Sequence, residues 1–314
     1  MSARNGLIAI GGNSLIRAGQ RGTVAEQRAN AHETARKITG LVAQGWRLVI
    51  THGNGPQVGA ALLRSERAAA EAYTHPLDVC VATTQSEIGY FLQCSLEQEL
   101  KKAGLKIPVT TVLTQVRVNS DDPAFSNPTK PIGPFYSQRV AEEKHAQLGW
   151  VMVEDSSRGY RRVVPSPEPV EILEMEIIRE ILGLGMIVIA LGGGGIPVIV
   201  REDCSVEGVE AVIDKDRASA LLASGLGLDH LIISTDVDRV YLNYRKPAQH
   251  AIDRASSAQM RQYCQEGHFA AGSMGPKIES AARFLDGGGK EVIITSFELL
   301  DEAVNGTAGT HITR

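Results

Sequence analysis

The amino-acid sequence predicts an α/β fold built around a mainly parallel β-sheet. Short apolar runs, several of them bounded by glycine, are separated by longer amphipathic stretches. Runs of this kind are typical of strands buried on both faces, and strands that alternate with helices form parallel crossovers. The predicted strands are Leu7–Ile10, Arg47–Thr51, Val109–Leu113, Met186–Leu191, His230–Ser234 and Glu291–Thr295.

The first helix is predicted from both of its ends. Thr23 and Glu26 have the spacing of a capping box, in which each side chain bonds the other residue's backbone N–H, and Gly45 suits a helix end that needs a positive φ. The remaining helices are predicted from amphipathic stretches and the residues that open them. They begin near Pro56, Pro76, Asp216 and Pro276, and one more follows Val170.

The segment from Asn119 to Pro169 interrupts this alternation. It contains seven prolines, one short helical stretch at Ser137–Leu148, and two β-like runs at Trp150–Glu154 and Tyr160–Val164. A long insertion in a compact fold is more often functional than idle, although a simple surface elaboration is the alternative. We therefore predict an inserted subdomain or lid.

Composition and charge narrow the class of protein. The chain has 314 residues, enough for one large α/β domain or two lobes, and 43% of them are hydrophobic, which excludes global disorder. A net charge of -4 gives no general attraction for nucleic acid or anionic membranes. There is no apolar run of about 20 residues that would span a membrane, and the 4 cysteines form no C-x-x-C pair. We expect a protein of the reducing cytoplasm.

Glycine gathers directly after three of the predicted strands. The clusters are Gly11-Gly12-Asn13, Gly53-Asn54-Gly55, and the four residues from Gly192 to Gly195. Ligands of open α/β sheets bind beyond the carboxyl ends of strands, and glycine lets backbone N–H groups approach a phosphate. A tight turn explains any single cluster equally well, but three at matching positions favour an anion site. A P-loop enzyme or a standard Rossmann dehydrogenase is disfavoured, because neither glycine motif is present.

Three lysines stand in conspicuous surroundings. Lys130 lies between prolines of the insertion, Lys215 lies between Asp214 and Asp216, and Lys277 follows Gly275-Pro276. A lysine ammonium can follow a phosphoryl group as it moves from donor to acceptor, so the set suits phosphoryl transfer. A solvated surface lysine is the alternative for each of them. We assign the organising role to Asp214 and the capping of the following helix to Asp216.

Other kinds of catalysis find less support. His52 is a candidate general base, but an acceptor that is already an oxyanion needs no proton removed, so we interpret His52 as a structural residue of its loop. The chain has no G-x-S-x-G nucleophile elbow. We interpret Ser273 as part of a nucleotide-binding loop.

Motifs spread over nearly the whole chain point to one family. They are AIGGNSL (9–15), GQRGTVAEQ (19–27), THGNGPQVG (51–59), PLDVCVA (76–82), NPTKPIGPFY (127–136), RRVVPSPEP (161–169), GGGGIPV (192–198), AVIDKDRASALLA (211–223), TDVDRVYLNY (235–244) and AAGSMGPKIESAARF (270–284). The sequence resembles the carbamate kinases, a branch of the amino acid kinase superfamily. It departs from their motifs at Ser14, where alanine is expected, and at Glu168, where lysine is common; neither residue carries the proposed chemistry.

The resemblance implies a three-layer αβα sandwich around a mainly parallel open sheet, with an inserted protruding subdomain, and a homodimer. It also implies two lobes. Residues 1–205, including the lid at 119–169, bind carbamate or carbamoyl phosphate, and residues 206–314 bind the nucleotide.

The resemblance further implies a role for each motif residue. Lys130, Lys215 and Lys277 are the catalytic cations, and Asp214 orients the lysines. The residues expected to bind substrate are Gly11, Gly12, Asn13, Gly53, Asn54 and Gly55, and those expected to bind nucleotide are Gly194, Asp236, Tyr241, Ser273, Met274, Gly275 and Pro276. Mg²⁺ bridges the phosphates mostly through water, with no metal ligand from the protein.

The expected reaction is reversible phosphoryl transfer from ATP to carbamate, giving ADP and carbamoyl phosphate, with net flow toward ATP in the cell. Two alternatives stay open. One is a kinase of the same superfamily that acts on another small carboxylate, against which the PTKPIGPFY stretch argues. The other is a catalytically idle ligand sensor on this fold, against which the intact Asp214, Lys215 and Lys277 argue.

Overall fold

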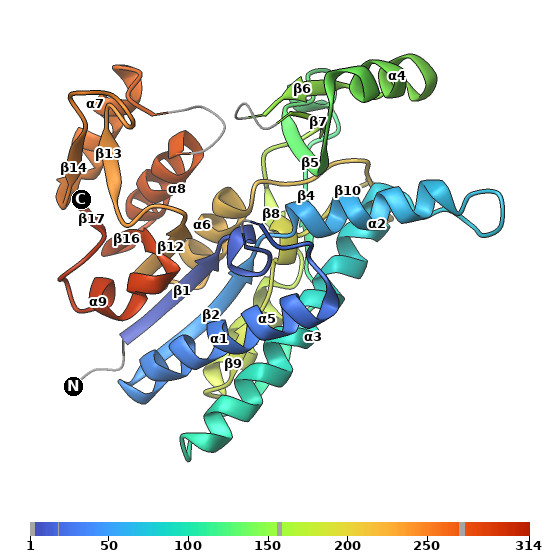
Figure 1. Ribbon diagram of the computed structural model, residues 1–314. Helices are drawn as coiled ribbons and strands as arrows, with labels where there is room; N and C mark the ends of the chain where they lie inside the picture. Colours follow the sequence, from blue (N-terminus) through green and yellow to red (C-terminus); the bar gives the residue numbers. More distant parts are fainter. Residues whose placement is uncertain (1–3, 18, 156–158, 270–273) are drawn as a thin grey trace.

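The computed structural model describes residues 4–17, 19–155, 159–269 and 274–314. Its largest sheet is formed by β1 (Arg4–Ile10), β2 (Trp46–His52), β3 (Val109–Thr111), β9 (Ile187–Ile189), β12 (His230–Thr235), β15 (Arg254–Ser256), β16 (Glu291–Ser296) and β17 (Thr310–Thr313). Within the described residues this sheet has eight strands in the order β15-β17-β16-β12-β1-β2-β9-β3. Figure 1 labels the six strands from β17 to β9. Neighbours from β16 to β3 are parallel, and β17 runs antiparallel to β16.

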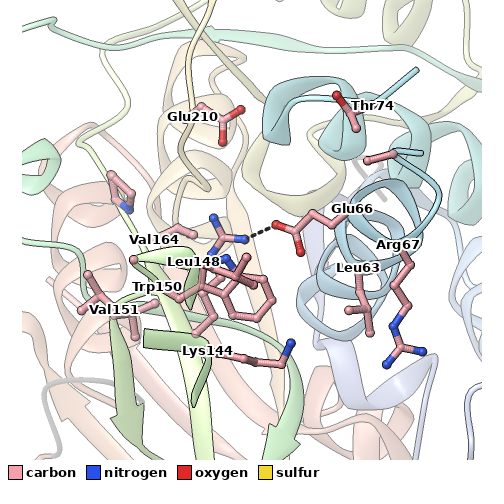
Figure 2. A pocket seen from close by; sticks show the side chains of 15 residues that line it. Leu63, Glu66, Arg67, Thr74, Lys144, Leu148, Trp150, Val151, Val164 and Glu210 are labelled. Carbon is pink, nitrogen blue, oxygen red and sulfur yellow. Dashed lines mark hydrogen bonds and ion pairs between the residues drawn. The ribbon is translucent and has the colours of Figure 1, made fainter. Parts of the chain in front are cut away.

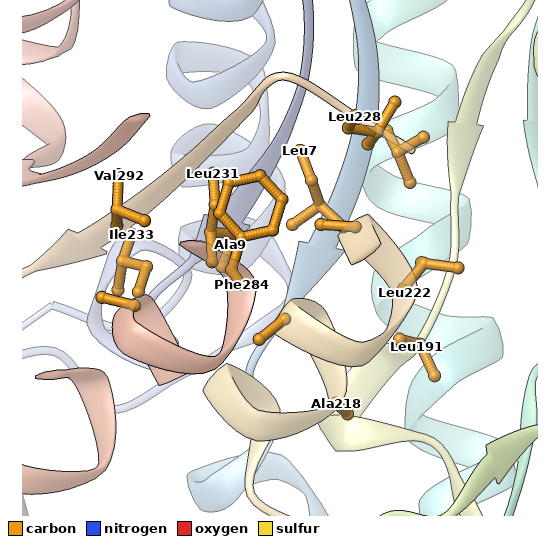
Figure 3. Close-up of a cluster of buried hydrophobic side chains, with 14 of the residues drawn as sticks. Leu7, Ala9, Leu191, Ala218, Leu222, Leu228, Leu231, Ile233, Phe284 and Val292 are labelled. Carbon is orange, nitrogen blue, oxygen red and sulfur yellow. The ribbon is translucent and has the colours of Figure 1, made fainter. Parts of the chain in front are cut away.

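Helices cover both faces of this sheet. On one face lie α1 (Val24–Ala43), α3 (Leu77–Lys102) and α9 (Leu300–Val304), and on the other lie α5 (Met175–Gly183), α6 (Lys215–Gly225) and α8 (Met274–Asp286). Along β1, Ile8 and Ile10 pack toward the first set, whereas Leu7 and Ala9 pack toward the second (Figure 3). This alternation puts apolar side chains on both faces of the strand, and the predicted three-layer α/β fold is confirmed.

The structure shortens two of the predicted strands. The run Val109–Leu113 ends as a strand at Thr111, and the chain then enters β4 (Gln115–Arg117) of a second sheet. Thr114 lies at the crossing, where its backbone N–H donates to the Gln85 side chain at 3.0 Å and its hydroxyl oxygen accepts from the Leu191 N–H at 3.0 Å. These side-chain bonds replace the backbone hydrogen bonds of the strand at this point. The predicted strand Met186–Leu191 is likewise shortened, to Ile187–Ile189 of β9. Apolarity alone therefore overestimates the length of both strands.

Helix ends follow their predicted signals closely. The Thr23–Glu26 capping box opens α1, and Gly45 adopts a φ of +90° just beyond its end. Prolines occupy the expected starts of α2 (Gly55–Arg67) and α3. The helix expected after Val170 is α5, which is preceded by the short strand β8 (Glu171–Ile172). No helix among the described residues combines the length and apolarity needed to cross a membrane.

The insertion forms a subdomain that projects from the large sheet (Figure 1). Its α4 (Gln138–Leu148), β6 (Met152–Glu154) and β7 (Tyr160–Val164) lie on the predicted stretches. A third strand, β5 (Lys130–Tyr136), was not predicted, because Pro131, Gly133 and Pro134 disfavour a strand. Proline is tolerated here because β5 is an edge strand, paired with β7 alone, and its register shifts between Ile132 and Tyr136.

Smaller elements complete the chain. A second sheet contains β8, β4, β10 (Ile196–Val200) and β11 (Val206–Gly208). The hairpin β13 (Val240–Leu242) and β14 (His250–Ile252) and the helix α7 (Ser257–Gln265) lie beside β17, near the C-terminus (Figure 1).

Candidate active site

The carboxyl ends of four parallel strands meet at one edge of the large sheet. These strands, β12, β1, β2 and β9, are consecutive neighbours, and three of them lead into the glycine clusters. A cavity of about 1220 Å³ opens at this edge, between the strand ends, the start of α6 and strand β5 of the protruding subdomain. It is therefore located where an α/β sheet binds its ligands.

Asp214 joins the start of α6 to the protruding subdomain. Its Oδ1 accepts hydrogen bonds from the backbone N–H groups of Asp216 at 2.9 Å and Arg217 at 3.3 Å, so Asp214 is the N-cap of α6. Its Oδ2 accepts from Lys130 Nζ at 2.6 Å. Burial opposes the charged carboxylate, but the charge and hydrogen bond of Lys130, together with the charge of Lys277, hold the pKa of Asp214 below its usual range. The assignment of the helix cap to Asp216 was wrong.

Asp216 holds the other two lysines. Its side chain is buried, with Oδ1 3.1 Å from Lys215 Nζ and Oδ2 2.7 Å from Lys277 Nζ. Burial disfavours its charge, yet the two ammonium groups hold the pKa of Asp216 well below its usual range. Asp216 therefore makes the direct contacts to Lys215 and Lys277, whereas Asp214 contacts Lys130 directly and acts on the other two lysines through its charge.

The two lysines that Asp216 contacts are largely enclosed, and they differ in their electrostatics. Burial lowers the pKa of Lys215, and Asp216 offsets only part of this effect. Burial also lowers the pKa of Lys277, but the charge and hydrogen bond of Asp216, together with the charges of Asp214 and Asp236, outweigh burial and raise the pKa. Lys215 Nζ also lies 3.4 Å from the carbonyl oxygen of Ala9 at the end of β1, which directs the ammonium toward the glycine loops.

Glycine allows these loops to pack closely against one another and against β12. A Cβ on Gly53 would lie 3.1 Å from Gly12 N, and one on Gly11 would lie 3.1 Å from the Ser234 carbonyl oxygen. The side chain of Asn54 is buried and donates to Thr84 Oγ1 at 2.8 Å. Of the residues expected to bind substrate, those that line the cavity are Gly11, Gly12, Gly53, Asn54 and Gly55; Asn13 lies in the short 3-10 helix that follows β1.

Of the residues expected to bind nucleotide, some line the cavity and others lie outside it. Asp236 lines the cavity directly after β12. Gly193 lines it as well, in place of the predicted Gly194. Gly194 lies against the backbone before α6, where a Cβ would approach the Ile213 carbonyl oxygen to 2.4 Å.

Tyr241 lies on β13, outside the cavity lining. Its hydroxyl donates to Asp238 Oδ1 at 2.7 Å, and its ring packs at 5.9 Å from that of Tyr244. Met274, Gly275 and Pro276 form the first turn of α8, so they precede Lys277 on the helix that delivers it. Ser273 lies outside the described residues.

His52 is buried between the glycine loops. Its Nδ1 lies 3.1 Å from the Gly53 carbonyl oxygen, and a Cβ on Gly192 would lie 2.6 Å from its ring. Burial, with a smaller contribution from the Lys215 charge, lowers the pKa of His52 to about 4. The imidazole is therefore neutral near pH 7 and packs as part of the loop, in agreement with the structural interpretation.

Arg161, which was not predicted from the sequence, lies on β7 and lines the cavity. Its Nε donates to the Gly133 carbonyl oxygen at 3.1 Å, and its NH1 pairs with Asp155 at 3.1 Å. It thereby supports the irregular part of β5, three residues beyond Lys130. The only sequence signal for Arg161 was its place at the start of the RRVVPSPEP stretch.

The protruding subdomain rests on α2. A Cβ on Gly59 of α2 would lie 2.0 Å from Gly133 Cα, so backbone meets backbone at this crossing. Beside it, a second cavity of about 740 Å³ is lined by α2, α4 and β7 (Figure 2). Across it Glu66 Oε1 accepts from Arg162 NH1 at 2.8 Å, drawn as the dashed line, and the Arg162 guanidinium stacks 4.5 Å from the Trp150 ring.

Comparisons with known proteins cover nearly the whole chain. The model of the amino acid kinase family matches residues 7–296. The carbamate kinase of Pyrococcus furiosus is 46% identical over 308 residues, covering 98% of each chain. Carbamate kinase 2 of Enterococcus faecalis is 47% identical over 312 residues, again covering 98% of each chain.

Solved structures agree with these relatives. The carbamate kinase from Giardia lamblia bound to AMP-PNP superposes with a TM-score of 0.90 at 40% identity and covers 99% of each chain. N-acetylglutamate synthase from Neisseria gonorrhoeae, at 17% identity and a TM-score of 0.57, shares the fold alone. With its sheet, its lysine and aspartate cluster and these full-length matches, the chain belongs to the amino acid kinase family and, within it, to the carbamate kinases.

Proposed function

We propose that this protein catalyses the reversible transfer of a phosphoryl group from ATP to carbamate, which yields ADP and carbamoyl phosphate. One observation carries the proposal: three lysines reach a single glycine-lined cavity, and each is held there by Asp214 or Asp216. Fixed cations and exposed backbone N–H groups are what a phosphoryl transfer requires of a protein.

Different residues of the cavity serve different parts of the reaction. A carbamate oxygen attacks the γ-phosphorus in line while the bond to the bridging oxygen of ADP breaks. Lys215 and Lys277 stabilise the negative charge on the phosphoryl oxygens, and the glycine loops after β1 and β2 bind those oxygens through backbone N–H groups. Lys130 binds the acceptor from the protruding subdomain. No general base is needed, because carbamate attacks as an anion, and the neutral His52 takes no part.

The two sides of the cavity would bind different partners. Residues 1–205 would bind carbamate or carbamoyl phosphate, and residues 206–314 would bind the nucleotide, with Asp236 at the end of β12 on the nucleotide side. Mg²⁺ would accompany the nucleotide and neutralise phosphate charge. Asp214 and Asp216 are both engaged by lysines, which favours phosphate oxygens and water as its ligands.

The remaining expectations rest on the resemblance and are proposals as well. They are a homodimer, a cytoplasmic location and net flow toward ATP in the cell. Light scattering of the purified protein tests the first of them. A mass of about twice the 33.7 kDa of the chain supports the dimer, and a mass equal to that of one chain contradicts it.

The reaction itself is tested by mixing the protein with Mg-ADP and fresh carbamoyl phosphate and following ATP with luciferase. Acetyl phosphate serves as the control donor. Rapid ATP formation from carbamoyl phosphate, and much slower formation from acetyl phosphate, is expected. A preference for acetyl phosphate favours a kinase of another small carboxylate, and ADP binding without ATP from either donor favours the sensor.

The lysines are tested by replacement in the same assay. We expect Lys215→Ala and Lys277→Ala to lower kcat by about two orders of magnitude or more, because each removes a charge that stabilises the transition state. Circular dichroism checks that both variants fold. Near-normal turnover in either variant contradicts the assignment of the phosphoryl site.

A further inference from the structure

Four charged side chains form a closed ring beside the cavity. Arg217 NH1 lies 2.9 Å from Glu168 Oε2, and Arg217 NH2 lies 3.0 Å from Glu279 Oε2. Arg283 closes the ring, pairing with Glu279 Oε1 at 2.7 Å and with Glu168 Oε1. Each carboxylate therefore bridges both guanidinium groups.

The ring members come from three separate segments. Arg217 lies on α6, and Glu279 and Arg283 lie on α8. Glu168 lies where the chain leaves the protruding subdomain, and its backbone N–H donates at 2.9 Å to Asp122, near the point where the chain enters it. The ring thus connects the base of the subdomain to both helices.

The ring also adjoins the phosphoryl site along the sequence. Arg217 directly follows Asp216, and Glu279 lies two residues beyond Lys277. The Asp216–Lys277 pair, at 2.7 Å, joins the same two helices that the ring joins. A shift of α8 against α6 would therefore change the place of the Lys277 ammonium.

We propose that Glu168 is a positioning residue of the phosphoryl site, which closes this ring and thereby fixes Lys277 of α8 against Asp216 of α6. The inference rests on the proposed function. Glu168 is also one of the positions at which the chain departs from the family motifs.

Electrostatics explains why a single carboxylate matters here. One exposed ion pair contributes little, but in this ring each charge has two partners of opposite sign. Without Glu168, Arg217 and Arg283 share the single carboxylate of Glu279 and repel each other. The buried Arg217 Nε has no partner among the described residues, so the guanidinium is held by its two terminal nitrogens alone. A small displacement is enough to lower the rate of an in-line transfer.

The experiment compares Glu168→Gln with the wild-type protein in the ATP-forming assay. Glu171→Gln is the matched control, because Glu171 lies three residues away and pairs at 2.8 Å with Arg117, which is on β4 and not on α6 or α8. We expect Glu168→Gln to lower kcat about 10-fold with a smaller change in KM for ADP, and Glu171→Gln to match wild type. Arg283→Gln removes the opposite side of the ring and is expected to act in the same direction.

Whether Glu168 acts through Lys277 is tested by combining Glu168→Gln with Lys277→Ala. In the Lys277→Ala background, Glu168→Gln is expected to change kcat less than about 2-fold, because the group that it positions is gone. An equal loss in both backgrounds overturns the inference, and so does a lower melting temperature with unchanged kcat. An inactive wild-type protein contradicts the proposed function as well, whereas an active wild type with an unaffected Glu168→Gln contradicts only the inference.

Discussion

At the scale of single residues, the two aspartates of the Asp-Lys-Asp sequence have separate tasks. Asp214 caps α6 and binds Lys130 of the protruding subdomain, whereas Asp216 binds Lys215 and Lys277. The separation follows from geometry. Asp214 precedes the helix, and its Oδ2 is directed toward Lys130 of β5, whereas Asp216, in the first turn, is directed toward Lys277 of α8.

Asp216→Asn tests this division of tasks. Removing the buried Asp216 carboxylate leaves two largely enclosed ammonium groups without their counter-charge. This loss costs about 3 kcal/mol of unfolding free energy, by analogy with broken buried ion pairs. We expect a lower urea midpoint together with a kcat reduced at least 100-fold.

Asp214→Asn is the comparison for this variant. The amide oxygen still caps α6, so its main expected effect is a higher KM for carbamoyl phosphate through the loss of the Lys130 pair. Equal losses of kcat in the two variants would contradict the separate tasks.

At the scale of elements, the position of the protruding subdomain is set by a backbone crossing. A Cβ on Gly59 of α2 would lie 2.0 Å from the Cα of Gly133 of β5, and Gly133 itself adopts a φ of +73°, a backbone conformation that favours glycine. The Arg161 bond to the Gly133 carbonyl and the Glu66–Arg162 pair hold the same region. Lys130 is three residues from this crossing. The position of the Lys130 side chain at the cavity therefore depends on the crossing.

Gly59→Ala is expected to displace the subdomain. The added methyl group would lie 2.0 Å from Gly133 Cα, and real side chains do not approach a backbone so closely. We expect KM for carbamoyl phosphate to rise about 10-fold or more, because Lys130 is displaced from the cavity, while the affinity for ADP, measured by calorimetry, changes little.

Gly40→Ala on α1 is the control for this substitution. Its methyl group would meet only Asp301 Oδ1, at 3.7 Å, so kinetic constants equal to those of wild type are expected. An unchanged KM for carbamoyl phosphate in Gly59→Ala would show that the crossing does not position Lys130.

At the scale of the whole molecule, the buried ionisable groups couple stability to pH. The pKa of His52 is lowered to about 4 by burial, whereas in the unfolded chain it has the ordinary value of about 6.5. Between these values the unfolded state binds a proton that the folded state excludes, so stability falls as the pH drops from 6.5 toward 4. The lowered pKa of Asp216 acts in the same direction at still lower pH.

Urea unfolding at pH 7.5, 6 and 5 measures this coupling. We expect the wild-type protein to lose about 2 kcal/mol between pH 7 and pH 5 through His52, and His52→Gln to lose correspondingly less. Replacing the exposed His250 by glutamine should leave the wild-type pH dependence unchanged. The same slope in His52→Gln and wild type would contradict a neutral, buried His52.

The sequence by itself determined the class of the fold and the edge of the sheet at which the site lies. Apolar runs, the Thr23–Glu26 box and glycine after the strands are local patterns, and local physics decides them: burial of both strand faces, capping, and freedom of φ. The lysines could also be found, since each stands in a recognisable motif.

Only the tertiary structure decided which strand pairs with β5 and which charged side chains pair with one another. Strand β5 forms despite its two prolines because it pairs at an edge, which no local propensity predicts. The pairing of Asp216 with Lys277 depends on where α6 and α8 cross, and Glu168, Arg217, Glu279 and Arg283 meet only after the lid, α6 and α8 have packed. Charge pairing is a matter of distance in space, and packing sets that distance.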